Sequence, residues 1–166
     1  MGTTSGRKGD PTPQDLRDQV SYMVRLIQIS AYKNFEKHTT GFGSAPRYYG
    51  LLRLVEANPG ITQSRLAEAI YLDRSSLVPI LDTLEREGYL ARTASATDKR
   101  VRCIALTPGG RARLEELKVH VRRHEDLIVD GLDEGERAIL RGLLQRIDGN
   151  LRRAAARTRR KRPVPA

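Results

Sequence analysis

The segment LDRSSLVPILDTLEREG, residues 72–88, decides the fold of this chain. Leu77, Leu81 and Leu84 recur within it at the spacing of one helix face, with a further isoleucine beside them. The repeat predicts a helix over residues 74–87 whose buried side is set by these leucines. The opposite side of the same helix is then free to meet a partner.

The ends of this helix are marked by residue types that favour a start and a stop. Asp73 is a good amino-terminal cap, and Gly88 is a good terminator. Pro79 lies inside the helix and removes one backbone hydrogen bond, leaving the carbonyl of Ser75 without its helical partner. We therefore expect a slight bend in the amino-terminal half, which would be tolerated if that half is exposed.

Apolar periodicity, together with Gly, Pro and Asn residues that favour turns, predicts further helices and two short strands on either side of this segment. The first helix is expected to open at Thr12 with Pro13 in its first helical position. The expected helices cover residues 12–37, 47–57, 63–70, 108–130 and 134–151, and the expected strands cover 90–93 and 101–106.

This order predicts a mainly α fold with a small β-hairpin wing, that is, a winged helix-turn-helix lobe plus a helical dimerisation region. The outer helices carry more apolar residues than one small core needs, which argues for a second subunit. The predicted organisation is a disordered arm (1–12), a helical dimerisation region (13–45 and 108–155), a DNA-binding lobe (46–107) and a basic disordered tail (156–166).

Composition narrows the function further. The formal net charge is +10, but seven basic residues and no acidic residue follow position 151, so the charge alone does not prove that the folded part binds nucleic acid. The single cysteine excludes an intrachain disulfide, and neither a bilayer-spanning apolar run nor a secretory signal is evident. We expect a cytoplasmic protein without a membrane partner. Because no nucleophile–base set or phosphate loop emerges, we do not expect an enzyme.

Two stretches carry a family resemblance. LAEAIYLDRSS (66–76) has the form of a helix-turn-helix, and Asp98-Lys99-Arg100 followed by IALTPGGRA (104–112) has the form of a wing and the start of the next helix. Over roughly residues 15–152 the chain resembles the MarR family of transcription regulators. The resemblance implies a homodimer that binds double-stranded DNA and, in most members, represses genes until a small molecule binds. One departure is Tyr71, where such sequences often have glycine. Either the turn avoids left-handed geometry, or Tyr71 serves another purpose such as lining a pocket.

The exposed side of the 74–87 helix is expected to enter the major groove. Ser75 and Ser76 could bond phosphates or base edges beside Arg74, and Val78 and Pro79 could contact a thymine methyl group. The alternative is that the serines only cap the helix and that Val78 is a stray exposed residue.

The wing is the second expected DNA contact. Asp98 and Arg100 lie two residues apart on one side of a hairpin, so Asp98 can brace an arginine. The resemblance makes Arg100 the best candidate for the minor groove, with Lys99 and Arg102 on nearby phosphates. The alternative is a solvated turn with a weak ion pair. The basic tail could equally add phosphate contacts or remain a solvated end.

The resemblance also implies an effector pocket where the dimer helices meet the lobe. Aromatic residues with an arginine suit an aromatic carboxylate, although the tyrosines could instead be core or interface residues. The candidates are Tyr22, Arg25, Tyr32, His38, Phe42, Arg47, Tyr48 and Tyr49. The run SSLVPILDTLE resembles that of members that respond to aromatic acids or their CoA thioesters.

No metal and no cofactor are expected. His120 and His124 share a helix face and could chelate zinc with His38, but His124 precedes Glu125 and Asp126 in a surface-like stretch. Cys103 is expected to fill space in a wing strand. The sequence thus predicts an effector-released repressor of a pseudo-palindromic operator. An architectural DNA protein without an effector and a zinc-sensing regulator remain the alternatives.

Overall fold

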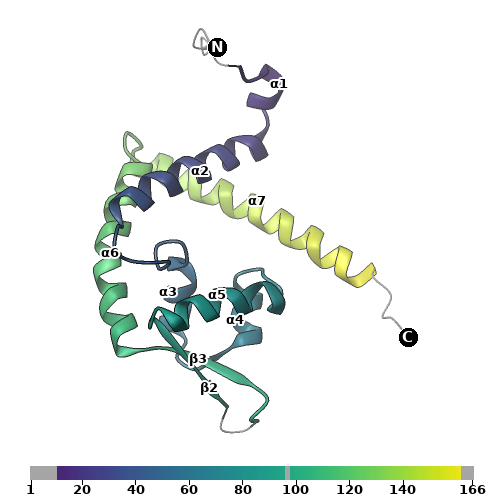
Figure 1. The fold of residues 1–166 in the computed structure, drawn as a ribbon. Helices are drawn as coiled ribbons and strands as arrows, with labels where there is room; N and C mark the ends of the chain where they lie inside the picture. The colour runs from purple at the N-terminus through teal and green to yellow at the C-terminus, as the bar shows by residue number, and fades with distance from the viewer. Residues whose placement is uncertain (1–10, 96–97, 162–166) are drawn as a thin grey trace. The chain divides into compact units, whose positions relative to one another are not determined.

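A computed structural model describes residues 11–95 and 98–161, and it confirms a mainly helical fold with a small antiparallel sheet (Figure 1). The chain forms two compact units, Met1–His124 and Glu125–Ala166. The winged helix-turn-helix lies in the first unit, and the longest helix lies in the second. The predicted assignment of roles to these segments remains a prediction.

The lobe places three helices against a three-stranded sheet, and strands β2 and β3 extend away from these helices (Figure 1). The elements are α3 (Tyr49–Ala57), β1 (Ile61–Thr62), α4 (Gln63–Ala69), α5 (Arg74–Arg86), β2 (Leu90–Ala94) and β3 (Arg102–Leu106). The strand order is β1-β3-β2, and both pairs are antiparallel. Strand β1 was not predicted, because two residues are too few to show a strand period. The strand is held by the pairing of Ile61 with Ile104.

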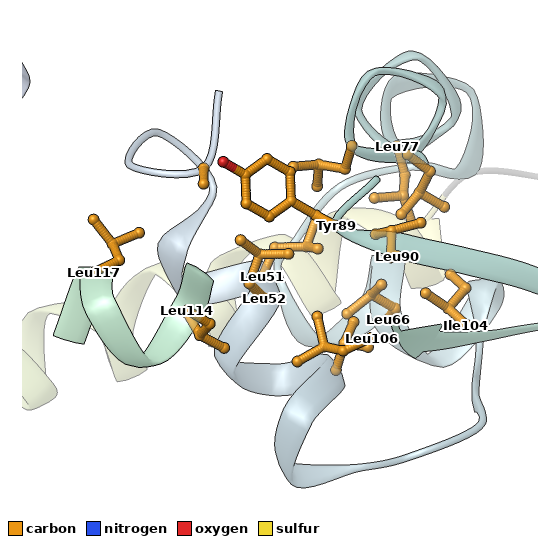
Figure 2. Close-up of a cluster of buried hydrophobic side chains, with 14 of the residues drawn as sticks. Leu51, Leu52, Leu66, Leu77, Tyr89, Leu90, Ile104, Leu106, Leu114 and Leu117 are labelled. Carbon is orange, nitrogen blue, oxygen red and sulfur yellow. The ribbon is translucent and has the colours of Figure 1, made fainter. Parts of the chain in front are cut away.

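The predicted core face of α5 is confirmed. Leu77, Leu81 and Leu84 are completely buried. Figure 2 shows side chains from α3, α4, α5, the sheet and the start of α6 (Pro108–Ile128) packed into one cluster. Its labelled members are Leu51, Leu52, Leu66, Leu77, Tyr89, Leu90, Ile104, Leu106, Leu114 and Leu117. This cluster fixes the orientation of α5, and it therefore also fixes the side that α5 exposes.

The turn between α4 and α5 uses the left-handed geometry that a glycine would favour. Tyr71 has a φ of 57° and is the one non-glycine residue with positive φ in the described part of the chain. The N–H of Leu72 donates to the carbonyl of Ala67 across this residue (3.0 Å), which closes α4 in the manner of a Schellman motif. The Tyr71 side chain is exposed. The turn thus adopts the strained geometry, and Tyr71 is not buried in a pocket of its own lobe.

The amino-terminal helix is not continuous, contrary to the prediction. The structure has a single turn, α1 (Gln14–Arg17), followed by α2 (Val20–His38), and Pro13 is the cap of α1 rather than its first helical residue. The break falls at Gln19, whose ψ of 118° is extended. The amide of Gln14 donates to the carboxylate of Asp18 (3.1 Å) at the end of α1. Neither Asp18 nor Gln19 is a strong helix breaker, so the residue types at this point did not predict the interruption.

Two long helices follow the sheet, α6 (Pro108–Ile128) and α7 (Glu134–Lys161). The predicted capping box is present: Glu136 N–H donates to Asp133 Oδ1 (2.9 Å), and Asp133 N–H donates to Glu136 Oε2 (3.0 Å). The prediction that the chain frays into a disordered tail from residue 156 is wrong as far as Lys161, because α7 continues to that residue. The rest of that tail, like most of the predicted arm, lies outside the described residues. No described helix is long and apolar enough to cross a membrane.

Candidate DNA-binding surface and effector site

The amino end of α5 is organised by the carboxylate of Asp73. Its Oδ1 accepts hydrogen bonds from the N–H of Ser76 (2.7 Å) and from the hydroxyl of Ser75 (2.5 Å), and its Oδ2 accepts from the hydroxyl of Ser76 (2.9 Å). These bonds, led by that from the Ser75 hydroxyl, lower the pKa of Asp73 to about 2. Asp73 is therefore an ionised cap, as its position in the sequence predicted.

Both serines serve the cap, yet both remain exposed beside Arg74. The structure thus contains the capping arrangement that was the alternative to DNA contact, but capping does not remove these side chains from the surface. Val78 is also exposed, at 37%. The predicted groove face is therefore solvent-accessible on one side of α5, whereas the leucine face is buried.

Pro79 is accommodated without ending the helix. The α5 helix runs continuously from Arg74 to Arg86 with the proline inside it. The hydroxyl of Thr83 donates to the Pro79 carbonyl (3.0 Å), and the N–H of Leu77 donates to the Asp73 carbonyl (3.1 Å). The missing donor of Pro79 falls in the exposed first half of the helix, where solvent can serve the carbonyl left behind.

The wing brings Asp98 and Arg100 together as predicted. The backbone N–H of Arg100 donates to Asp98 Oδ1 (2.9 Å), and its Nε lies 3.3 Å from the same oxygen. The backbone bond is the leading cause of a lowered pKa at Asp98. The Arg100 side chain is 92% exposed, and its guanidinium also reaches Asp98 Oδ2 through an Nη atom (3.5 Å), so the side chain is held by Asp98 while it faces solvent.

Arg102 begins β3, two residues after Arg100. It pairs with Ala94 at the end of the β2–β3 ladder that leads into the turn holding Lys99 and Arg100, and its side chain is exposed. Arg102 also lines a cavity of about 280 Å³ together with Gln63, Glu85 and Arg92.

An ion-pair cluster that was not predicted from the sequence joins α5 to β2. The guanidinium of Arg92 lies 2.7 Å from an oxygen of Asp82 and contacts the carboxylate of Glu85 through both Nε (2.9 Å) and an Nη atom. Hydrogen bonding to Glu85 is the leading cause of a raised pKa at Arg92, and the same bond lowers the pKa of Glu85. Asp82 and Glu85 thus hold α5 to β2 through Arg92.

Some of the predicted effector residues lie close together. The Tyr32 hydroxyl donates to Glu36 (3.2 Å), and the guanidinium of Arg47 lies 5.8 Å from the Tyr48 ring centre. Burial is the leading cause of a raised pKa at Tyr32, and Arg47 and Tyr48 also act on it through charge. The carboxyl half of α2 and the start of α3 therefore combine a phenol, a ring and an arginine.

The other effector candidates lie elsewhere. Tyr22 and Arg25 lie nearer the start of α2, His38 Nδ1 lies 2.8 Å from the carbonyl of Asn34 on its own helix, and Tyr49 packs against the core cluster. Phe42 is 7% exposed and belongs to the core, so the expectation that it is available to a ligand is not supported by its burial.

A larger cavity, of about 410 Å³, lies where the loop after α2 meets the end of α5 and the start of α6. Its lining residues are Gly41, Gly43, Glu87, Gly88, Tyr89, Gly109, Gly110 and Arg113. Arg113 donates to the Gly41 carbonyl (2.6 Å) and lies over the ring of Phe42, while the Tyr89 hydroxyl donates to the Phe42 carbonyl (2.5 Å). This cavity was not predicted, because its walls are mainly glycines from distant segments.

The histidines pack against aromatic rings. His120 meets Phe42 edge-on at 5.4 Å, and His124 lies 4.9 Å from Phe35 with Nδ1 buried and unbonded. His124 is thus partly buried against Phe35, whereas Glu125 and Asp126 after it are exposed, as expected for a surface-like stretch. Within residues 11–95 and 98–161 no group of three metal-ligating side chains is present. Cys103 is partly buried in β3 opposite Thr93, consistent with a strand filler.

Comparison with known proteins points to one family. A sequence profile of the MarR family matches residues 46–101. A putative transcriptional regulatory protein for the hcr operon of Thauera aromatica is 35% identical over 149 residues, which cover 84% of this chain and 90% of that relative. The structure of the repressor CouR on a 23-mer DNA duplex has a TM-score of 0.76 and 30% identity, covering 84% of this chain and 99% of CouR. The structure of the PcaV regulator of Streptomyces coelicolor with its natural ligand has a TM-score of 0.74 and 25% identity, covering 83% of this chain and 97% of PcaV.

The exposed α5, the wing and these similarities define a winged-helix transcription regulator. The chain belongs to the MarR family.

Proposed function

We propose that this protein is a homodimeric repressor that binds a pseudo-palindromic operator and is released by a small aromatic acid or aryl-CoA thioester. The observation that carries the proposal is the pairing of an exposed, capped α5 amino end with a wing whose Arg100 is held by Asp98. A helix suited to the major groove and an arginine suited to the minor groove then act from one rigid lobe.

Exposed apolar residues support the dimer. A monomer rarely exposes so many large aliphatic side chains along its helices, and a second copy would cover them. On α2 they are Val20, Met23, Val24, Leu26, Ile27 and Ile29, and on α7 they are Ile139, Leu140, Leu143, Leu144, Ile147 and Leu151. Such a dimer would present two α5 helices to successive major grooves.

The class of effector is inferred from side-chain chemistry and from relatives. Arg47 offers two parallel donors to a carboxylate, with the rings of Tyr32 and Tyr48 as apolar neighbours. CouR has also been seen bound to p-coumaroyl-CoA, and that structure is 28% identical to this chain with a TM-score of 0.75. A regulator that meets such metabolites would work in the cytoplasm.

A gel-shift experiment with the intergenic DNA beside the protein's own gene tests the proposal. We expect a discrete footprint, loss of the shift on adding an aryl carboxylate or its CoA thioester, and weaker binding by Arg100→Ala at unchanged thermal stability. Uniform protection of all DNA would favour an architectural protein. Unchanged affinity of Arg100→Ala would contradict the role of the wing.

A further inference from the structure

The hydrogen-bond polarity of Ser75 is fixed by Asp73. A carboxylate with a pKa near 2 is ionised at neutral pH and can only accept hydrogen bonds. The 2.5 Å contact between Ser75 Oγ and Asp73 Oδ1 therefore uses the single hydrogen of that hydroxyl. What remains on Ser75 Oγ is a pair of acceptor sites.

The hydroxyl hydrogen of Ser76 is also engaged by Asp73. Both the N–H and the hydroxyl of Ser76 donate to Asp73, over 2.7 Å and 2.9 Å. The first turn of α5 thus presents hydroxyl oxygens whose hydrogens are already engaged. Phosphate oxygens are acceptors only, so these two hydroxyls cannot donate to the DNA backbone without breaking the cap.

The major groove does offer donors. Adenine presents its N6 amino group and cytosine its N4 amino group, whereas guanine and thymine present acceptors at the corresponding positions. We propose that Ser75 is a specificity-determining residue that accepts a hydrogen bond from the exocyclic amino group of an adenine or cytosine, with Asp73 as the residue that sets this polarity. The proposal rests on the proposed DNA-binding function and adds the chemistry of one base contact.

The test removes the amino group on the DNA side of the contact and the hydroxyl group on the protein side. Each adenine of the operator is replaced in turn by purine, which lacks the amino group, and each cytosine by pyrimidin-2-one, and binding is measured for the wild type and Ser75→Ala. At one position in each half-site we expect the wild type to lose about fivefold in affinity, the worth of one ordinary hydrogen bond, and Ser75→Ala to lose nothing further. If no amino deletion distinguishes the two proteins, or if Ser75→Ala weakens every sequence equally, the assignment is overturned.

Asp73→Asn tests the cause of the polarity. Asparagine is as good a helix cap as aspartate, so α5 should be retained, but its amide can donate to Ser75 and free the serine hydrogen. We expect this variant to fold normally and to lose the dependence on the amino group; full retention of that dependence would overturn the role of Asp73. Thr40→Val, which removes an exposed hydroxyl from the loop after α2, is the matched control and should keep the wild-type pattern. A wild-type protein that fails to bind the operator would refute the proposed function, whereas binding without any amino-group dependence would refute this inference alone.

Discussion

The guanidinium of Arg92 on β2 lies between the carboxylates of Asp82 and Glu85 on α5. This cluster fixes the position of β2 relative to α5. We predict that Arg92→Gln lowers the free energy of unfolding by about 1 kcal/mol, the upper range for partly exposed ion pairs. Operator affinity should fall as well, because the wing and α5 would no longer be held in one geometry. Urea unfolding and gel shifts at two salt concentrations measure both effects.

Arg86→Gln is the control for that experiment. Arg86 is an exposed arginine at the end of α5 and makes one long contact, 3.5 Å, to the hydroxyl of Thr83. Arg86→Gln should change neither the free energy of unfolding nor the operator affinity by more than the effect of one lost surface charge. Equal behaviour of the two variants would mean that the Arg92 cluster contributes charge but no rigidity.

The close approach of α6 to Tyr89 predicts a sharp difference between two adjacent glycines. A Cβ added to Gly110 would lie 1.9 Å from the Tyr89 carbonyl oxygen, whereas one added to Gly109 would lie 3.9 Å from its nearest neighbour. Gly110→Ala should therefore destabilise the protein by roughly 3 kcal/mol, since backbone cannot move aside cheaply. Gly109→Ala should be neutral or raise stability by up to about 1 kcal/mol, because alanine is the better helix former. Thermal unfolding of the pair measures this difference, and similar melting temperatures would contradict the packing at Tyr89.

The fold was predictable because it depends on long periodic segments. The buried leucines of α5, the hairpin and the capping box at Asp133 all follow from local pattern. The break at Gln19 was not predictable, since neither it nor its neighbours are strong helix breakers. The left-handed Tyr71 was not predictable either, because a Schellman closure can override the residue's own preference.

For the candidate site, the sequence predicted which side chains are exposed better than it predicted which contacts they make. The positions of Ser75 and Arg100 on exposed faces follow from spacing, but the engagement of the serine hydroxyls by Asp73 needs coordinates. The packing of His124 on Phe35 was missed for a related reason. It depends on contacts between α2 and α6, which are far apart in the sequence and leave no local signal.

The acid dependence of stability should reveal the Asp73 cap. Its pKa is about 2 in the native state against an ordinary 3.8, so the native state binds the proton less readily than the unfolded chain. The cap therefore stabilises the protein fully above about pH 4, and the stabilisation is lost as the pH falls towards 2. Between these values the wild type should lose more stability than Asp73→Asn, whose cap does not titrate. Parallel stability curves for the two proteins from pH 5 to pH 2 would contradict the hydrogen-bond network at this carboxylate.

Pro79 offers a test of the exposed half of α5. Pro79→Ala restores a donor for the carbonyl of Ser75 in a helix that is otherwise continuous. We expect unchanged or greater stability, with a gain of up to about 3 kcal/mol, since that is the cost of proline in a helix interior. Operator preference should change at the same time, because the proline ring lies on the exposed side of α5 that is proposed to enter the groove. Val78→Ala, which trims the neighbouring exposed side chain and leaves the backbone alone, should alter binding without altering stability. Loss of folding in Pro79→Ala would show instead that the proline is structural.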